Sequence, residues 1–370
     1  MSLEPVALVW ENLGPPHHDR LRAVHDAGHR LVAVQLFRKS AIYDWERDDA
    51  PPYQVVTLAD ALESVGFVRL AWRIFRAVRK SGARDVYMCH YEMPAVILAS
   101  WMLKLSGCRV YTMLNSKFDD RPRHWRMTPA KALAFAAYRG AIIASERSRD
   151  YAAYFGIPRA RTVGGYNTLD IARLRAQSGA GEAVSFGDRP FLAVAQLIPR
   201  KNLKFALTVF ARYRHEHGGT RRFVIVGNGV QEPELREHVA SLAVSDEVEF
   251  AGAMPSAGVT ALMRRSLALL LPSLEETYGY VVLEAMAMGL PAIVSLRAGA
   301  ADLVSNLVNG FLIDPTEEEQ LLTAMLMLDR DEALHATMAK AALETSDRGD
   351  ARHFAAGVGQ LLELNGKSSG

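Results

Sequence analysis

The sequence predicts an α/β protein built from two Rossmann-like domains that face each other across an interdomain cleft. Short apolar segments alternate with helical patterns through both halves of the 370-residue chain, which is typical of βαβ units and parallel sheets. The alternation stops at a polar, glycine-containing stretch, residues 177–189, and then restarts. A chain of this length also exceeds what one hydrophobic core usually supports.

The first half provides the elements of one sheet. We predict strands at five apolar segments: Val6–Trp10, Leu31–Phe37, Val86–His90, Val110–Leu114 and Ala141–Ser145. Helical spacing of apolar residues predicts helices between them: Asp19–Ala27, Val68–Lys80, Pro94–Leu105 and Pro129–Tyr138. Residues 1–176 are therefore expected to form the first domain.

The second half repeats this organisation. Strands are predicted at six segments: Phe191–Leu197, Phe223–Gly227, Val248–Gly252, Ala268–Pro272, Ala292–Ser295 and Phe311–Ile313. Helices are predicted between them: Leu203–His215, Glu232–Leu242, Ser256–Arg264 and Val281–Met288. We expect residues 190–348 to form the second domain, and the last helical pattern, within residues 349–370, to cross back to the first.

Composition excludes several classes of protein. The formal net charge of +2 gives no general attraction to nucleic acid. The two cysteines, Cys89 and Cys108, make neither a disulfide framework nor a Cys-x-x-Cys site. The start of the sequence lacks the pattern of a signal peptide, and no apolar run reaches about 18 residues. We therefore expect a cytoplasmic protein.

The strongest functional signal lies between residues 271 and 291, where a strand, a turn and a helix follow one another. Glu276 falls in the turn and Glu284 in the helix, eight residues apart. Free backbone N–H groups near Tyr280 and Val281, where the helix begins, suit a phosphate. Glu284 can accept hydrogen bonds from both hydroxyls of a ribose. Two solvated surface glutamates are the alternative, but Glu284 lies in an apolar run, where an unpartnered carboxylate is costly.

This segment resembles the Glu-x7-Glu region of retaining glycosyltransferases that have the GT-B fold, of the family-4 type (glycosyl transferases group 1). Four further segments resemble the same family in order and spacing: residues 223–229, 248–252, 298–302 and 309–315. The resemblance spans residues 190–316. It implies that Glu284 binds the donor ribose and that Glu276 lies near the donor sugar.

The turn between residues 196 and 203 is the second donor-site candidate. Arg200 and Lys201 stand beside a helix start, with Asn202 as the expected N-cap, and suit a diphosphate; a basic surface turn is the alternative. The family resemblance implies that Lys201 grips the diphosphate. Gln196 replaces the arginine that is usual there, so Arg200 is the expected substitute. The remaining donor-binding candidates are Asn228, Gly229, Thr277, Tyr278, Gly279, Tyr280 and Val281.

The first half carries polar residues after its predicted strands. Gly14 is the only glycine of a loop that is glycine-rich in the family. Two prolines stiffen that loop, so His17 and His18 are the expected contacts; an exposed histidine pair is the alternative. Asn115 stands where the family often has a histidine that supports the leaving group. His90, after the neighbouring strand, is the other candidate, and a packed core histidine is the alternative for it.

We expect no metal and no cofactor. Asp119 and Asp120 lack the Asp-x-Asp spacing, and GT-B glycosyltransferases generally need no metal. Two basic and aromatic segments, Val68–Lys80 and Arg121–Arg126, suit an anionic lipid-linked acceptor or peripheral contact with the inner face of a membrane. For the first segment we prefer the interpretation of an ordinary helix with a solvated face.

The resemblance implies transfer of a hexose-type sugar from a nucleotide-diphosphate sugar to a hydroxyl of a saccharide or lipid-linked acceptor, with retention of configuration. The biological setting would be synthesis of bacterial polysaccharide, glycolipid or another glycoconjugate. Lys201 and Arg200 would meet the charge of the leaving group. The alternatives are a GT-B-fold epimerase or phosphorylase and a non-catalytic nucleotide-sugar-binding subunit, which Gln196 and Asn115 keep open. No Gly-x-Gly-x-x-Gly follows the first strand, which disfavours a nicotinamide dehydrogenase.

Overall fold

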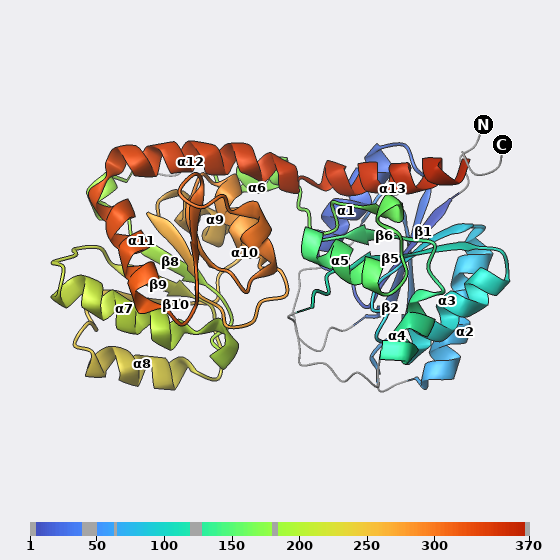
Figure 1. Cartoon of the computed structure of the whole chain (residues 1–370), viewed down its shortest axis with the longest axis horizontal. Coiled ribbons are helices and arrows are strands. Elements are labelled where there is room, and N and C mark those ends of the chain that lie inside the picture. The colour runs from blue at the N-terminus through green and yellow to red at the C-terminus, as the bar shows by residue number, and fades with distance from the viewer. Residues whose placement is uncertain (1–4, 39–49, 63–64, 119–127, 180–183, 367–370) are drawn as a thin grey trace. The chain divides into compact units, whose positions relative to one another are not determined.

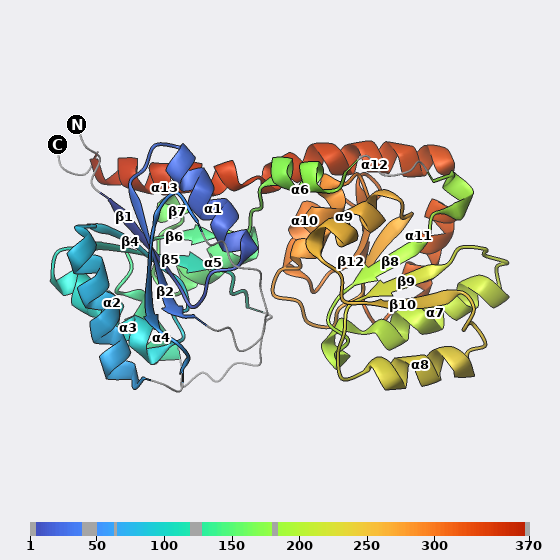
Figure 2. The same cartoon turned by 180° about the vertical axis from the view of Figure 1, so that it is seen from behind.

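The chain folds into two compact α/β units. The computed structural model describes residues 5–38, 50–62, 65–118, 128–179 and 184–366. The first unit comprises Met1–Asp170 and Asp350–Gly370, and the second comprises Ile171–Gly349 (Figure 1). In the described residues each unit contains one parallel sheet flanked by helices, which Figure 2 shows from behind.

The sheet of the first unit has seven strands in the order β3-β2-β1-β4-β5-β6-β7 within the described residues. Their bounds are β1 Val6–Trp10, β2 Leu31–Phe37, β3 Gln54–Ala59, β4 Asp85–Met88, β5 Arg109–Leu114, β6 Gly140–Ile143 and β7 Thr162–Val163. All five predicted strands are present, and the first two match residue for residue. The prediction missed β3 and β7, the two strands at the edges of the sheet.

Helices flank these strands, and the last of them, α13, comes from the C-terminal end of the chain. Their bounds are α1 Pro15–Asp26, α2 Phe67–Ser81, α3 Pro94–Leu105, α4 Thr128–Phe135, α5 Glu146–Tyr154 and α13 Ala351–Gly366. The four predicted helices are confirmed, but the first begins earlier than expected. Gly14 is the N-cap of α1, and Pro15 and Pro16 occupy its first turn, where proline is well tolerated because the first N–H groups of a helix need no intrahelical partner. The interpretation of Pro15–His18 as a stiff loop is therefore wrong.

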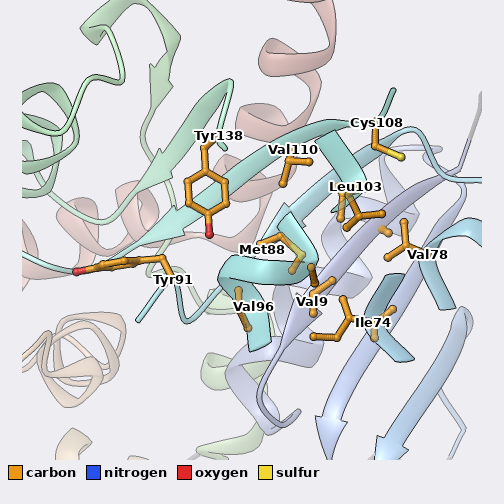
Figure 3. Packing of buried hydrophobic residues seen from close by; sticks show 14 of the residues in the cluster. Val9, Ile74, Val78, Met88, Tyr91, Val96, Leu103, Cys108, Val110 and Tyr138 are labelled. Atoms are coloured by element: carbon orange, nitrogen blue, oxygen red, sulfur yellow. The ribbon is translucent and has the colours of Figure 1, made fainter. Parts of the chain in front are cut away.

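The core of the first unit lies on both faces of its sheet. On one face, Val9 of β1 and Met88 of β4 pack with Ile74 and Val78 of α2 (Figure 3). Leu8, the neighbour of Val9 in β1, belongs to the buried cluster on the opposite face. This alternation, with both faces buried, is the burial expected of a central parallel strand.

The second unit has six strands in the order β10-β9-β8-β11-β12-β13 in the part of the chain that the structure describes. Their bounds are β8 Phe191–Val194, β9 Phe223–Val226, β10 Val248–Gly252, β11 Ala268–Leu271, β12 Ala292–Ser295 and β13 Gly310–Ile313. The helices are α6 Ile171–Gln177, α7 Leu203–His215, α8 Glu232–Ser241, α9 Ser256–Arg264, α10 Tyr280–Ala287, α11 Glu318–Arg330 and α12 Glu332–Ser346. Every predicted strand and helix of this half is present.

Two helices, α6 and α13, lie where the chain passes from one unit to the other. α6, which the sequence analysis placed in the first domain, is part of the second unit. Arg175 of α6 donates to the Ala287 carbonyl (3.3 Å) and to the Ser346 hydroxyl (2.9 Å), both in that unit. The C-terminal α13 is part of the first unit, where it packs on α1. Among the described residues, no helix has the length and apolar character needed to cross a membrane.

In both sheets the order of the strands reverses beside the first strand of the unit. β1 lies between β2 and β4, and β8 lies between β9 and β11. Ligands of open α/β sheets bind beyond the carboxyl ends of the strands at such a reversal. The loops that follow β8 and β11, and those that follow β1 and β4, are therefore the places to look for a functional site.

Candidate functional site

The loops after β8 and β11 are joined at fixed positions. The Leu274 amide donates to the Arg200 carbonyl (2.9 Å). The side-chain amide of Asn202 donates to the carbonyls of Pro272 (3.2 Å) and Pro315 (2.8 Å). Asn202 has a left-handed backbone, with φ of +57°, and its side chain does not cap α7. Asn202 is therefore the N-cap residue of α7, as predicted, but its side-chain amide holds three loops together and makes no capping hydrogen bond.

Lys201 and Glu276 form an ion pair across the strand reversal. The Lys201 ammonium donates to Glu276 Oε2, and the two side chains are only 13% and 10% exposed. The Gly299 amide donates to the Glu276 carbonyl (3.1 Å), and Glu276 pairs with Ala298 as an isolated bridge, so its backbone is fixed on the side of β12. Thr277, the next residue, is exposed. Lys201 and Glu276, both predicted as site residues, are 75 positions apart in the sequence and meet in one site.

Gly279 ends this turn and is the N-cap of α10. Its φ is +97°, and a Cβ atom added there would lie 3.0 Å from Leu271 Cδ2 and 3.3 Å from Glu276 Cγ. The left-handed backbone therefore favours glycine, and the close packing of the two side chains adds to that preference. The Ala300 amide donates to the Tyr278 carbonyl (2.7 Å), which anchors the other side of the turn. The start of α10 is thus held next to the Lys201–Glu276 pair.

Glu284 lies one turn into α10. Its neighbours Leu283 and Ala285 are fully buried, whereas Glu284 is half-buried. Tyr280 and Val281, four and three residues earlier, are half-buried as well, and residues at this spacing share a face of a helix. The structure therefore places Glu284 on the same face as the two residues that open the helix.

The loop after β9 packs against the loop after β8. The Leu197 amide donates to the Asn228 carbonyl (2.9 Å). A Cβ atom on Gly229 would lie 2.3 Å from the Leu197 carbonyl oxygen, so only glycine permits this approach of the two backbones. Gln196, which precedes this contact, is half-buried, and Asn228 is exposed. Gln196, Asn228 and Gly229 therefore share one edge of the sheet with Lys201.

In the first unit, His17 lies in the first turn of α1. Its Nδ1 accepts a hydrogen bond from the Gly14 amide (3.1 Å), and its ring lies edge-on to Trp10, 5.4 Å away. Burial, together with the positive charges of Arg20 and His90, lowers the pKa of His17 well below 6.5. The ring is therefore neutral at pH 7, with its proton on Nε2.

His18 does not have the predicted contact role. It is buried, and its Nδ1 is hydrogen-bonded to the Tyr53 hydroxyl (2.8 Å). The two rings also stack, with their centroids 6.3 Å apart. His18 therefore packs inside the first unit.

His90 follows β4 and has a left-handed backbone, with φ of +59°. Its Nδ1 lies 3.2 Å from Glu92 Oε1 and 3.9 Å from Glu11 Oε2, and its side chain is 28% exposed. Burial favours the neutral ring, but the neighbouring Cys89 and Glu92 outweigh it, so the pKa of His90 is raised well above 6.5. His90 is therefore a partly exposed cation rather than a packed core histidine.

Asn115 follows β5, the next strand of the sheet. Its Oδ1 accepts from Asn167 Nδ2 (2.5 Å), and its carbonyl accepts from the Ser148 hydroxyl (3.2 Å). The structure brings His17 and His90 to the ends of the adjacent strands β1 and β4, with Asn115 one strand further.

Arg20, which the sequence alone does not single out, supports the start of α1. Arg20 is buried, donates to the Tyr166 carbonyl (2.6 Å), and lies 5.0–5.8 Å from the ring centroids of Tyr166, Trp10 and Phe354. The aromatic partners come from β1, α13 and the segment before α6. In the sequence Arg20 is one of several polar residues of a helix, and nothing local distinguishes it from a solvated one.

The described residues contain no group of three His, Cys, Asp or Glu side chains that is arranged to hold a metal ion. Asp119 and Asp120, which the sequence analysis considered for this role, lie outside the described residues, as does the basic segment Arg121–Arg126.

Solved structures share the fold along nearly the whole chain. The complex of Anabaena Alr3699/HepE with UDP is 18% identical, with a TM-score of 0.73, over 98% of this chain and 100% of that chain. A glycosyltransferase from Rickettsia africae ESF-5 is 12% identical, with a TM-score of 0.77, over 98% of both chains. The predicted class, an α/β protein with two Rossmann-like domains and the GT-B fold, is confirmed.

Within that class, residues 182–345 match the model of the family described as "Glycosyl transferases group 1". These residues make up most of the second unit, which is therefore similar to the group 1 glycosyltransferases.

Two curated relatives match parts of this chain. An exopolysaccharide phosphotransferase, SCO2592 of Streptomyces coelicolor, is 34% identical over 41% of this chain, but the match covers only 16% of that protein. A D-inositol 3-phosphate glycosyltransferase of Kribbella flavida is 24% identical over 72% of this chain and 68% of that protein.

Proposed function

We propose that this protein transfers a sugar from a nucleotide-diphosphate sugar to an acceptor hydroxyl, with retention of configuration and without a metal. The observation that carries the proposal is the Lys201–Glu276 pair at the strand reversal of the second unit, next to the start of α10. The family match of residues 182–345 supports glycosyl transfer. The solved structures of HepE with UDP, with UDP and glucose, and with UDP-glucose support a nucleotide-sugar donor.

The diphosphate would lie between Lys201 and the N-terminus of α10. Lys201 supplies a nearly buried positive charge, and Arg200 precedes it in the same short helical turn, Pro199–Lys201. The N-terminus of a helix adds the positive end of its dipole and backbone N–H donors. In the absence of donor, the Glu276 carboxylate neutralises the Lys201 ammonium. When the donor binds, its diphosphate would replace Glu276 as the partner of Lys201. The Glu276 carboxylate would then be available to accept hydrogen bonds from hydroxyls of the sugar.

The nucleoside would be recognised further along α10. Glu284 shares a half-buried face with Tyr280 and Val281, one turn beyond the phosphate position. A carboxylate there can accept hydrogen bonds from both ribose hydroxyls at once.

The chemistry requires stabilisation of the leaving group rather than a covalent nucleophile. As the bond between the sugar and the phosphate breaks, charge develops on the diphosphate, and Lys201 and Arg200 would meet that charge. Donors that are fixed in place before the reaction stabilise such charge strongly, and loss of one typically costs about 10²–10³ in rate. The acceptor hydroxyl attacks from the same face and gives its proton to the departing phosphate oxygen.

We assign the acceptor side to the first unit. His17 is held neutral, with Nε2–H as a donor, and His90 is held as a cation at the end of the next strand. Relatives named for amylovoran and colanic acid biosynthesis make a saccharide or lipid-linked acceptor, in the synthesis of bacterial polysaccharide or another glycoconjugate, the proposed setting.

A two-stage experiment tests the proposal. A thermal-shift panel of nucleotide diphosphates and nucleotide sugars identifies the donor, since a ligand present at 100 times its Kd stabilises by about 2.7 kcal/mol. The donor is then incubated with the protein in EDTA, and release of nucleotide diphosphate is measured with and without saccharide acceptors.

We expect slow hydrolysis of the donor without acceptor, and Lys201→Ala should lower kcat more than it raises KM. Release of a free epimerised sugar would identify an epimerase instead. Donor binding with no turnover under any condition would identify a non-catalytic subunit.

A further inference from the structure

Helix α2 of the first unit has an inner face that accounts for its packing. Leu70, Ala71, Ile74 and Val78 are fully buried, and Ile74 and Val78 point toward the sheet in Figure 3. These residues recur at the three- and four-residue spacing of one helical face. The contacts that hold α2 in the unit therefore do not need any apolar residue on its outer side.

The outer side of α2 nevertheless carries large apolar side chains. Phe67, Val68 and Trp72 are 56%, 58% and 53% exposed. Trp72 and the half-buried Phe75 have ring centroids 5.5 Å apart. Phe75 also packs against the core of the unit, whereas Phe67, Val68 and Trp72 are exposed. Val68, Trp72 and Phe75 are spaced by four and three residues, so the exposed Val68 and Trp72 form an apolar strip that ends at Phe75. An ordinary solvated helix face has polar residues at such positions, and a contiguous apolar strip indicates an interaction surface.

A basic strip lies beside this apolar strip. Arg69, Arg76 and Lys80 are exposed and repeat at helical spacing, and Arg79 lies at the end of the same side. The segment Phe67–Ser81 contains no aspartate or glutamate. Within the described part of the chain, the ion pairs of the structure do not include any of these four cations. The outer side of α2 therefore combines exposed positive charge with exposed apolar area.

We propose that this outer side of α2 docks the first unit on the surface of an anionic lipid bilayer. Tryptophan and other large apolar side chains enter the headgroup region of a bilayer, and flanking arginine and lysine side chains contact the lipid phosphates. A nucleic acid would use the cations but not the apolar strip, and the net charge of +2 gives no general attraction to polyanions. The views of Figures 1 and 2 agree that α2 lies at the periphery of its unit. The solvated-face interpretation, preferred from the sequence, does not account for three half-exposed apolar side chains.

The proposal goes beyond glycosyl transfer and is tested without it. The full chain is mixed with vesicles of phosphatidylglycerol and phosphatidylcholine, or of phosphatidylcholine alone, and the bound fraction is measured by co-sedimentation. We expect binding that requires the anionic lipid and weakens as salt is raised. Vesicles with brominated acyl chains report insertion, because they quench tryptophan fluorescence on contact. This quenching should be largely lost in Trp72→Phe, which keeps an aromatic ring at the position.

Charge variants give the expected magnitude. One cation near an anionic bilayer is worth roughly a fivefold change in affinity, so Arg69→Gln/Arg76→Gln should weaken vesicle binding about 25-fold. The matched control is Arg264→Gln/Arg265→Gln, which removes the same charge from exposed residues of the second unit. Trp72→Ser, which removes the exposed aromatic ring, should also weaken vesicle binding. Leu105→Ser, which removes an exposed leucine of α3, is its control and should bind like the wild type. Thermal unfolding of each variant verifies that it is folded.

Three results would overturn the proposal: no binding to anionic vesicles near physiological salt, equal binding of the α2 variants and the wild type, or binding to RNA as tight as to vesicles with no quenching of Trp72. Failure of the donor experiment above would leave the vesicle result unaffected, so the two proposals are separately testable.

Discussion

The Lys201–Glu276 pair allows a double-mutant cycle that separates its cost in stability from its use in catalysis. Both side chains are nearly buried, so removal of one partner leaves the other charge poorly solvated. Breaking such a pair typically destabilises by about 3–5 kcal/mol. We therefore expect Lys201→Met to lower the free energy of unfolding by about 3 kcal/mol, at the lower end because some exposure remains.

In a unit of this size, a change of 1 kcal/mol shifts the Tm by roughly 2–4 °C, so the transition of the second unit should fall by about 6–12 °C. The double variant Lys201→Met/Glu276→Leu should recover most of this loss, because replacing a whole buried pair with apolar residues is often neutral or stabilising. Scanning calorimetry measures the stabilities of Lys201→Met, Glu276→Leu and the double variant, and donor turnover should be lost in all three. A double variant as unstable as the two single variants combined would refute the reasoning, since it would show that the two charges do not depend on each other.

Three further predictions follow from the same geometry. Asn202→Gly keeps the left-handed backbone but loses the bonds to two carbonyls, so urea unfolding should show a loss of about 1–2 kcal/mol. Asn202→Ala should lose about 1 kcal/mol more from backbone strain, and equal losses would contradict the role of the backbone. Because the folded-state pKa of His17 is lowered, the unfolded chain binds a proton that the folded chain does not, and the free energy of unfolding should decrease as pH falls below about 6.5. His17→Gln should flatten that slope, and an unchanged slope would exclude His17 as its source. Arg20→Met should weaken the attachment of α13 to α1, seen as faster amide hydrogen exchange in α13; unchanged exchange would show that Arg20 is not needed there.

The sequence predicted those elements whose local pattern is strong. Buried strands such as Val6–Trp10 are continuous apolar runs, and helices such as Leu203–His215 show regular spacing, so both were located closely. The edge strand Gln54–Ala59 is only partly buried and lacks that signal. Glu318–Arg330, by contrast, carries buried residues at helical spacing and could have been identified.

The site was predicted in part because its residues occur in one recognisable segment with a fixed spacing. The sequence pointed to Lys201 and Glu276 separately, and the strand order explains why they meet. The position of Asn202 as the N-cap of α7 was predicted, but the bond of its side chain to Pro272 was not, because that bond depends on tertiary contacts. His17 and His18 were taken together, yet helix geometry places the first beside Trp10 and the second in the interior.

The central claim is that α10 recognises the nucleoside of a sugar nucleotide through Glu284, and titration calorimetry of the nucleotide diphosphate selected by the thermal-shift panel tests it most directly. Hydrogen bonds to a charged group contribute about 1.5–3 kcal/mol, so Glu284→Ala should weaken binding by about 10- to 100-fold. Glu275→Ala, which removes an exposed carboxylate of the adjacent turn, should bind like the wild type. Equal affinity of Glu284→Ala and the wild type would contradict the account.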